Sequence, residues 1–132
     1  MRSVIQQSLI LPASAERLYS MYLDPALHAA ITGAPVTISS QPQSEFSAFG
    51  GASSGRMLGT LPTKLIVQSW RANQFLTTDP DSTLILSFQP AAEGGQIDLL
   101  PLDVPDHDYV GVTEGWEKYY WTPWREYLET HG

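Results

Sequence analysis

Aromatic side chains are concentrated at the end of this chain. Six of the last seventeen residues are Trp or Tyr, in a segment whose other residues favour a helix. A helix with this much aromatic surface has to be covered, and because strand-like segments precede it, we expect a curved sheet to wrap around it. Bulky rings between a sheet and a helix also predict a cavity. The rings belong to Trp116, Tyr119, Tyr120, Trp121, Trp124 and Tyr127.

Length and composition indicate one domain over residues 1–132. Of the 132 residues, 42% are hydrophobic, which is enough for a single core and too many for a disordered chain. The chain has no cysteine, which excludes disulfides and thiol chemistry and suits a reducing compartment. The sequence shows no leader-like segment and no apolar run long enough for a membrane span, so we expect a cytoplasmic location.

The charge balance argues against two classes of partner. The chain has 14 acidic and 7 basic residues, a net charge of −7, and no cluster of Lys or Arg. A surface of this kind repels phosphate groups. We therefore expect neither nucleic acid nor an anionic membrane as a partner.

A strand and two short helices are predicted first. The strand covers 3–10. Ser14 is a typical N-cap for the first helix, and the Asp24-Pro25 pair interrupts that helix because proline restricts the residue before it. The second helix, 25–32, ends at Gly33.

Short β-favouring runs, divided by turn residues, fill the middle of the chain. Because the connections are short, neighbouring strands should form an antiparallel meander. The whole order predicts an α+β fold with about seven strands. The runs after the first strand are 36–38, 45–49, 53–61, 65–70, 83–88 and 96–100.

A long helix is predicted from Asp106, with Asp106 and Asp108 placed to complement its N-terminal dipole. Pro123 predicts a kink, since it cannot donate a hydrogen bond to the carbonyl of Tyr119. A period of 3.6 residues defines the face that should meet the sheet. That face comprises Tyr109, Val112, Trp116, Tyr119, Tyr120, Pro123 and Tyr127.

Trp121, Trp124 and Leu128 fall beside that face and form an apolar flank. One interpretation is that another protein surface covers it, most simply a second copy of the chain in a two-fold dimer. The alternative is that the short helices or loops of the same chain cover it. Under the first interpretation, these three residues are the candidate partner surface.

Several short motifs occur in a specific order. They are Leu11-Pro12-Ala13-Ser14, Asp24-Pro25, Phe46-Ser47-Ala48-Phe49, Ile66-Val67-Gln68-Ser69-Trp70-Arg71, Gly115-Trp116 and Tyr119-Tyr120-Trp121-Thr122-Pro123. Together they resemble the domain shared by the C-terminal half of activators of heat-shock protein 90 ATPase and many small bacterial proteins, in the START-like (SRPBCC) superfamily. The resemblance covers nearly the whole chain.

This resemblance implies a helix-grip fold, in which a strongly curved antiparallel sheet of about seven strands holds one long C-terminal helix and two short helices close one end. Better-understood relatives bind apolar small molecules or lipids between sheet and helix. The eukaryotic activators belong to a chaperone complex, and some START-like proteins are enzymes of the cyclase or hydratase kind.

The candidate cavity residues are the side chains that strand alternation places on the inward face of the sheet, together with two residues of the last helix. Gln68 shares the face of Ile66 and Trp70 and is the candidate polar handle for a ligand. The alternative is that these side chains pack as a collapsed core. The full set is Phe46, Ile66, Gln68, Trp70, Leu84, Leu86, Phe88, Ile97, Leu99, Trp116 and Tyr120.

The sequence contains no catalytic constellation. The segment 103–108 has three Asp and one His, as a hard-cation site would, but acids at the start of a helix explain it without a metal. Arg71, at a strand end, is interpreted as a surface ion-pair partner rather than a contact for a ligand carboxylate. We therefore predict no catalytic residue, no metal and no cofactor.

Three functions follow from these observations. The leading hypothesis is non-catalytic binding of an apolar or aromatic small molecule or lipid between sheet and helix. The second is a protein-interaction module, linked to a chaperone as the heat-shock protein 90 activators are. The third is an enzyme of the cyclase or hydratase kind, which the lack of a polar constellation disfavours.

Overall fold

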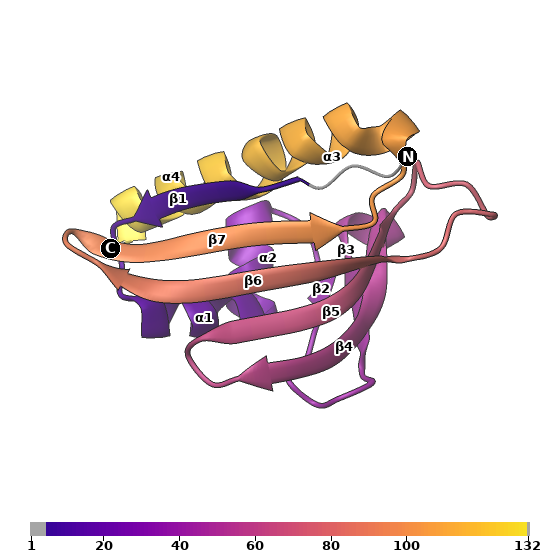
Figure 1. Cartoon of the computed structure of the whole chain (residues 1–132). Helices are drawn as coiled ribbons and strands as arrows, with labels where there is room; N and C mark the ends of the chain where they lie inside the picture. The colour runs from indigo at the N-terminus through magenta and orange to yellow at the C-terminus, as the bar shows by residue number, and fades with distance from the viewer. Residues whose placement is uncertain (1–4, 132) are drawn as a thin grey trace.

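The computed structural model describes residues 5–131, and Figure 1 shows how its strands and helices are arranged. Seven antiparallel strands form one sheet in the order β1-β7-β6-β5-β4-β3-β2. This confirms the predicted α+β helix-grip fold. The strands are β1 (Gln7–Leu11), β2 (Val36–Thr37), β3 (Glu45–Ala48), β4 (Ser53–Leu61), β5 (Leu65–Ala72), β6 (Ser82–Ala91) and β7 (Gly94–Leu102).

The helices fall into two groups. Two short helices, α1 (Ala15–Leu23) and α2 (Pro25–Thr32), follow β1, and the single turn η1 (Phe49–Gly51) connects β3 to β4. The long helix after β7, which we call the C-terminal helix, consists of η2 (Asp106–Asp108), α3 (Tyr109–Trp116), η3 (Glu117–Trp121) and α4 (Thr122–His131). Within the described residues, no helix is long and apolar enough to cross a membrane.

Strand bounds differ from the predicted ones mainly at the ends. β1 begins at Gln7, and residues 3 and 4 of the predicted strand lie outside the described residues. β6 and β7 are longer than predicted, because their pairing continues to Ala91 and Gly94 beside the turn at residues 92–93. Gly94 and Gly95 are therefore part of β7.

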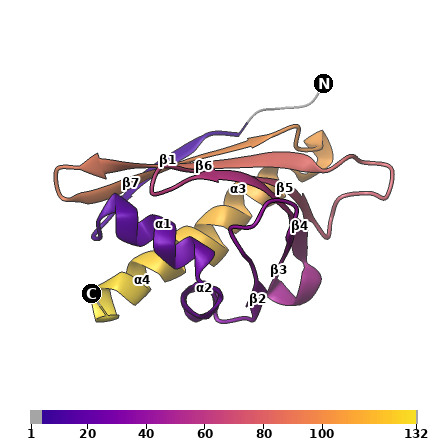
Figure 2. The ribbon, with the colours of Figure 1, turned by 90° about the horizontal axis from the view of Figure 1, so that it is seen from below.

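Two features of β4 allow the sheet to curve. The pairing of β4 with β5 shifts register between Met57 and Gly59, which marks a bulge. At Gly55, a Cβ atom would collide with the carbonyl of Ser69 in β5, so only glycine permits the close approach of these strands. Figure 2 shows α1, α2 and the C-terminal helix on the same side of the sheet.

The short helices begin and end where the sequence predicts. Ser14 accepts a hydrogen bond from the backbone N–H of Arg17 at 3.2 Å. Asp24 does the same for the backbone N–H of Ala26 at 2.8 Å. Gly33 ends α2 in the left-handed conformation, with φ at 78°. These caps explain how the chain turns twice before it enters β2.

The C-terminal helix contains a π-helical turn, η3, just before Pro123. The N–H of Thr122 bonds to the carbonyl of Glu117, five residues earlier. Because a π-turn holds one more residue than an α-turn, every residue after it is shifted by one position around the helix. A π-turn therefore lies where the sequence predicted a proline kink.

This shift corrects the predicted buried face of the helix. After the π-turn, Trp124 and Leu128 are buried, whereas Pro123 and Tyr127 are only partly buried. Tyr119, within the turn, is 49% exposed. The prediction for Tyr119, Pro123 and Tyr127 was wrong because it assumed one uninterrupted α-helical period.

The expected apolar flank is also covered by the chain itself. Trp121, Trp124 and Leu128 are only 7%, 1% and 2% exposed. Helix α2 packs against α4, as the alternative interpretation of the sequence required. These three side chains therefore offer little exposed surface to a partner.

Side chains of β1 and of the helix connect these two elements. Gln7 accepts a hydrogen bond from the indole N–H of Trp121 at 2.6 Å and donates one to the carbonyl of Thr113 at 3.0 Å. Arg125 donates to the carbonyl of Ile10 at 2.9 Å. Gln7 therefore holds the helix both at the π-turn and one turn before it.

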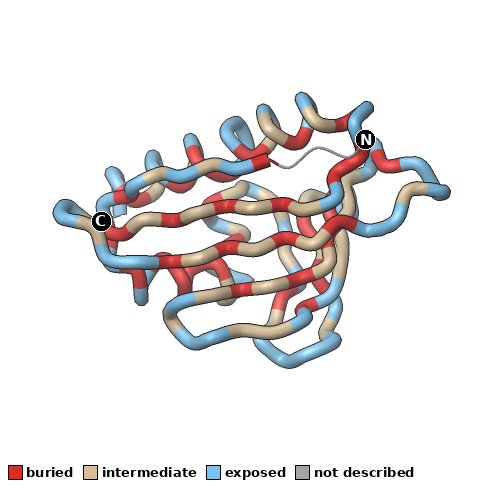
Figure 3. Tube along the Cα trace, viewed as in Figure 1, coloured by how far each residue is buried: buried red, intermediate tan, exposed pale blue. Residues whose placement is uncertain are grey.

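Buried and partly buried residues alternate along the central strands (Figure 3). All the side chains predicted to face the space between sheet and helix are buried, and none is more than 4% exposed. The inward register of these strands agrees with the prediction. Whether the side chains line a pocket or fill a core depends on the helices that they meet.

Candidate ligand-binding site

A pocket of about 420 Å³ lies between the first half of the C-terminal helix and one end of the sheet. Its walls come from η1 and the start of β4, from the end of β5 with the loop that follows, and from residues 108–120. Aromatic side chains dominate the lining, and we call this site the aromatic pocket. They are Phe49, Trp70, Trp116, Tyr119 and Tyr120.

These rings contact one another in a continuous chain. Trp116 and Tyr120 stack with centroids 4.1 Å apart, and Trp70 lies 6.2 Å from Trp116. On the other side, Phe49 lies 5.7 Å from both Tyr119 and Tyr120. Because packed aromatic rings restrain each other, the pocket has a preformed wall.

Two polar groups in this wall are unpaired. Over the described part of the chain, nothing accepts a hydrogen bond from the buried indole N–H of Trp70 or of Trp116. Most buried donors in folded proteins do have a partner. The pocket wall therefore departs from the usual pairing of buried polar groups.

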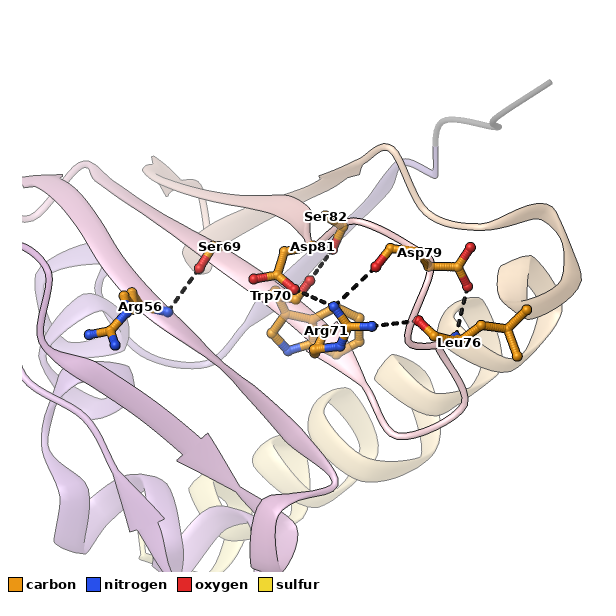
Figure 4. A network of polar contacts seen from close by, with 8 residues as sticks. All are labelled: Arg56, Ser69, Trp70, Arg71, Leu76, Asp79, Asp81 and Ser82. Carbon is orange, nitrogen blue, oxygen red and sulfur yellow. Dashed lines mark hydrogen bonds and ion pairs between the residues drawn. The ribbon is translucent and has the colours of Figure 1, made fainter.

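Arg71 organises the loop between β5 and β6, which borders the pocket. Its guanidinium donates hydrogen bonds to the carbonyls of Leu76 at 2.8 Å and Asp79 at 3.2 Å (Figure 4). It also forms an ion pair with Asp81 at 2.5 Å. The interpretation of Arg71 as an ion-pair partner is confirmed, and its hydrogen bonds fix the loop backbone as well.

The same loop is joined to the pocket wall at two places. Phe75 packs edge-on against Trp70 with centroids 6.0 Å apart, and the Arg71 guanidinium lies 5.5 Å from the Phe75 centroid. His107 Nε2 lies 2.9 Å from a carboxylate oxygen of Asp79, which connects the loop to η2. Arg71 therefore supports the pocket indirectly, through the loop.

Asp108 is the one charged residue among the described residues that line the pocket. It is 7% exposed, its side chain does not cap α3, and its carboxyl group has no hydrogen-bond partner within residues 5–131. Burial raises the pKa of this carboxyl group, and the neighbouring His107 partly opposes that effect. Asp108 was predicted to be one of the acids complementing the helix dipole, but the structure places it at the pocket.

A buried polar cluster lies next to the pocket around Tyr120. His28 Nδ1 lies 2.8 Å from the Tyr22 carbonyl, and His28 Nε2 lies 2.9 Å from the Tyr120 hydroxyl. Because a carbonyl can only accept, the His28 proton is on Nδ1 and the Tyr120 hydroxyl donates to Nε2. The Tyr22 hydroxyl donates to Gln68 Oε1 at 3.0 Å. The cluster therefore links α1, α2, β5 and the C-terminal helix.

Burial determines the charge of this cluster. It lowers the pKa of His28 to about 4, against the weaker effect of the hydrogen bond to Tyr22. It raises the pKa of Tyr22, with a further contribution from Tyr120, and it raises the pKa of Tyr120. All three side chains are neutral at pH 7, so the cluster acts as a structural link between elements.

Residues 12–129, which contain the whole pocket and the buried cluster, match the family described as Activator of Hsp90 ATPase homolog 1-like protein. The chain belongs to this family. A curated relative from Schizosaccharomyces pombe, an uncharacterized protein, is 38% identical over 73 residues. That match spans 55% of this chain and only 22% of the relative's length.

Solved structures share the fold of this chain. PFC0360w, an HSP90 activator from Plasmodium falciparum, has a TM-score of 0.83 and 15% identity, over 96% of each chain. MLL2253 from Mesorhizobium loti has a TM-score of 0.82 and 16% identity, over 98% of this chain and 99% of the other. The Aha1 dimer from Colwellia psychrerythraea has a TM-score of 0.80 and 10% identity, over 96% of each chain.

Of the cavity residues predicted for this family member, the structure brings Trp70, Trp116 and Tyr120 to the aromatic pocket. The others pack in the core, where α1 and α2 fill the concave face; the Tyr19 ring, for example, lies 5.6 Å from that of Phe88. They do not line the aromatic pocket. They are Phe46, Ile66, Gln68, Leu84, Leu86, Phe88, Ile97 and Leu99.

Gln68 is not the polar handle of this pocket. Its Oε1 accepts from Tyr22, and its Nε2 has no partner within the described chain. Local sequence patterns could not predict that Tyr22 lies opposite Gln68, because the contact joins α1 to β5 across the core. Gln68 therefore belongs to the buried polar cluster.

Phe49, Tyr119 and Asp108 are among the pocket residues that the predicted cavity set did not contain. Phe49 lies in η1 with φ at 54°, where strand alternation no longer applies. Tyr119 stands in the π-turn, and Asp108 was interpreted as a dipole-complementing acid. The Phe49-Gly50-Gly51 triplet was the available signal, since it places a ring in a turn. Among residues 5–131, Asp, Glu and His side chains nowhere gather in threes that could hold a metal ion.

Proposed function

We propose that this protein, as a single START-like domain, binds an apolar or aromatic small molecule or lipid in the aromatic pocket without catalysing its conversion. The observation that carries the proposal is the preformed wall of contacting rings around about 420 Å³. Pockets of this size and composition are typical of small-molecule sites. The cysteine-free composition suits a cytoplasmic location, which is part of the proposal.

The buried histidine next to the pocket is not placed for acid–base chemistry. His28 is 1% exposed and does not line the pocket, and both of its ring nitrogens are already bonded. A general acid or base needs hydrogen-bond reach to its substrate and a pKa near the working pH. His28 has neither, which supports a non-catalytic role.

A pocket-filling variant tests this proposal. A Cβ at Gly115, which lines the pocket, would meet only the Tyr119 ring at 3.9 Å, an ordinary contact. Gly115→Leu should therefore fill the pocket while keeping the fold. The probe is the neutral dye N-phenyl-1-naphthylamine, whose fluorescence rises in apolar sites, and we expect the variant to bind it at least about tenfold more weakly.

Glu114→Leu is the matched control, because Glu114 is exposed on the same helix and does not line the pocket. It should bind the dye as the unmodified chain does. Thermal unfolding of both variants shows whether they are folded. Unchanged dye binding by a folded Gly115→Leu variant would mean that the pocket is not the site.

A second candidate function is a chaperone-linked interaction module. It is favoured by the family match over residues 12–129 and by the fold shared with the Plasmodium activator. Pull-down of heat-shock protein 90 by the full chain, with no dye binding, would support this candidate instead. The Colwellia relative is a dimer, so sedimentation velocity should accompany the pull-down to detect a homodimer through some other surface.

A further inference from the structure

The one charged residue among the described residues that line the aromatic pocket is an acid, Asp108. Asp108 is only 7% exposed as a whole residue. Its carboxyl group has no hydrogen-bond partner within residues 5–131. Burying an unpaired carboxylate is unfavourable, and proteins normally supply a cation or several donors. The neighbouring His107 offsets this cost only in part, since its ring is paired with Asp79.

The Asp108 carboxyl group occupies the space that a side chain at Gly111 would fill. Gly111, one helical turn later, also lines the pocket, and a Cβ there would collide with Asp108 Oδ1. Any larger residue at Gly111 would therefore push the carboxyl group away. His107 lies beside Asp108 in the chain, but its ring pairs with Asp79. The absence of a side chain at Gly111 keeps Asp108 against the helix surface that borders the pocket.

The rings around Asp108 attract positive charge, as its carboxylate does. The faces of Trp, Tyr and Phe carry negative electrostatic potential and attract organic cations, most strongly where water is excluded. At the edge of the pocket the chain already shows this contact, because Lys118 Nζ lies 5.2 Å from the Tyr119 centroid. Lys118 itself does not line the pocket.

We propose that the ligand of the aromatic pocket is an organic cation, an apolar or aromatic body with a quaternary ammonium or protonated amine. Its charge lies against the Asp108 carboxylate and the faces of Trp70, Trp116 and Tyr120. This inference rests on the proposed binding function and names the chemical class of the ligand. The net charge of −7 also favours the approach of a cation.

Two probes of nearly the same shape test the charge preference. Phenyltrimethylammonium is a cation, and tert-butylbenzene is its neutral counterpart. Binding is followed by the NMR signals of the indole N–H groups of Trp70 and Trp116, which belong to the pocket wall. We expect the cation to bind at least about tenfold more tightly than the neutral probe.

Asp108→Asn should remove this preference and leave the affinity for tert-butylbenzene unchanged. Glu114→Gln removes the same charge from an exposed position of the same helix and should retain the preference. Equal affinities of the unmodified chain for both probes, or a preference that survives Asp108→Asn, would overturn the cation inference. In those cases the proposed function stands, provided that the neutral dye binds and Gly115→Leu weakens its binding.

If neither probe nor the neutral dye shifts or quenches any pocket signal, both the cation inference and the proposed function are refuted. Thermal unfolding of Asp108→Asn shows that the comparison is made on a folded protein. Because the variant removes a carboxyl group whose pKa is raised by burial, we expect its unfolding midpoint at pH 7 to be equal or higher.

Discussion

The Tyr120 hydroxyl lies 2.9 Å from His28 Nε2, although the two residues are 92 positions apart in the chain. This contact joins α2 to the π-turn of the C-terminal helix, at the residue that also stacks on Trp116. The same tyrosine therefore belongs to the pocket wall and to the buried polar cluster. A substitution in the cluster should therefore also alter the position of the Tyr120 ring in the pocket wall.

The first prediction concerns acid stability. Burial lowers the pKa of His28 to about 4 in the folded protein, from 6.5 in the unfolded chain. Between these values the unfolded chain binds a proton that the folded protein does not, so stability is complete above pH 6.5 and decreases as the pH falls toward 4. The loss should approach about 3 kcal/mol between pH 7 and pH 4.

Urea unfolding at several pH values measures this effect, with His28→Gln as the comparison. The variant should be less stable at pH 7 but should lose less stability on acidification, because the carboxyl groups common to both proteins contribute equally. Parallel pH profiles for the two proteins would show that His28 does not cause the acid sensitivity.

The second prediction concerns the hydroxyl of Tyr120. Tyr120→Phe keeps the ring stacked on Trp116 but removes the donor to His28, leaving a buried acceptor unpaired. It should lower the free energy of unfolding by about 1–3 kcal/mol. Tyr119→Phe, at an exposed position, is the control and should change it by less than about 0.5 kcal/mol. Equal effects in the two variants would contradict the role of the hydrogen bond.

The third prediction follows from the burial of Trp124, which is 1% exposed. Trp124→Ala should cost about 3–5 kcal/mol, because it leaves a large cavity between α4 and α2. Trp124→Glu should unfold the monomer rather than separate two copies of it. Circular dichroism and sedimentation velocity together decide this, and a folded, monomeric Trp124→Glu protein would show that this position is exposed.

The fourth prediction concerns the loop held by Arg71. Arg71→Ala removes two hydrogen bonds to the loop backbone and the ion pair with Asp81. Because the ion pair is partly exposed, the global loss should be modest, about 1 kcal/mol. Hydrogen exchange in residues 73–81 should increase at least about tenfold, since local opening needs only these contacts to break.

Arg71→Lys should not restore the protection of the loop, because a single ammonium cannot reproduce the fork of the guanidinium. Exchange in β6 and β7 should stay unchanged in both variants. A loop that keeps its protection in Arg71→Ala would mean that Phe75 packing holds it without Arg71.

The sequence allowed most of the sheet to be predicted because strand periodicity is local. The alternation of Ile66, Gln68 and Trp70 was enough to place all three side chains inward. The pocket was harder, because its location depends on which part of the concave face the short helices fill. That depends on tertiary contacts such as the one between Tyr22 and Gln68.

The C-terminal helix shows most clearly what could not be predicted from the sequence. Its first half follows the expected period through Val112 and Trp116, and its second half is shifted by the π-turn. The N–H of Glu117 bonds to the carbonyl of Glu114, and Gln7 from β1 donates to the carbonyl of Thr113. A contact between residues so far apart in the chain leaves no local periodic signal.

The same helix is one residue longer than its buried side chains require. Without Tyr119, Val112, Trp116, Tyr120, Trp124 and Leu128 would fall on a single α-helical stripe. The additional residue imposes a less favourable backbone turn and adds a fifth ring beside Phe49. Deleting it would straighten the hydrogen-bond ladder, preserve the anchoring of α4 and leave one side of the pocket open. The shape of the pocket opening can therefore change by one inserted or deleted residue, without any substitution in the core.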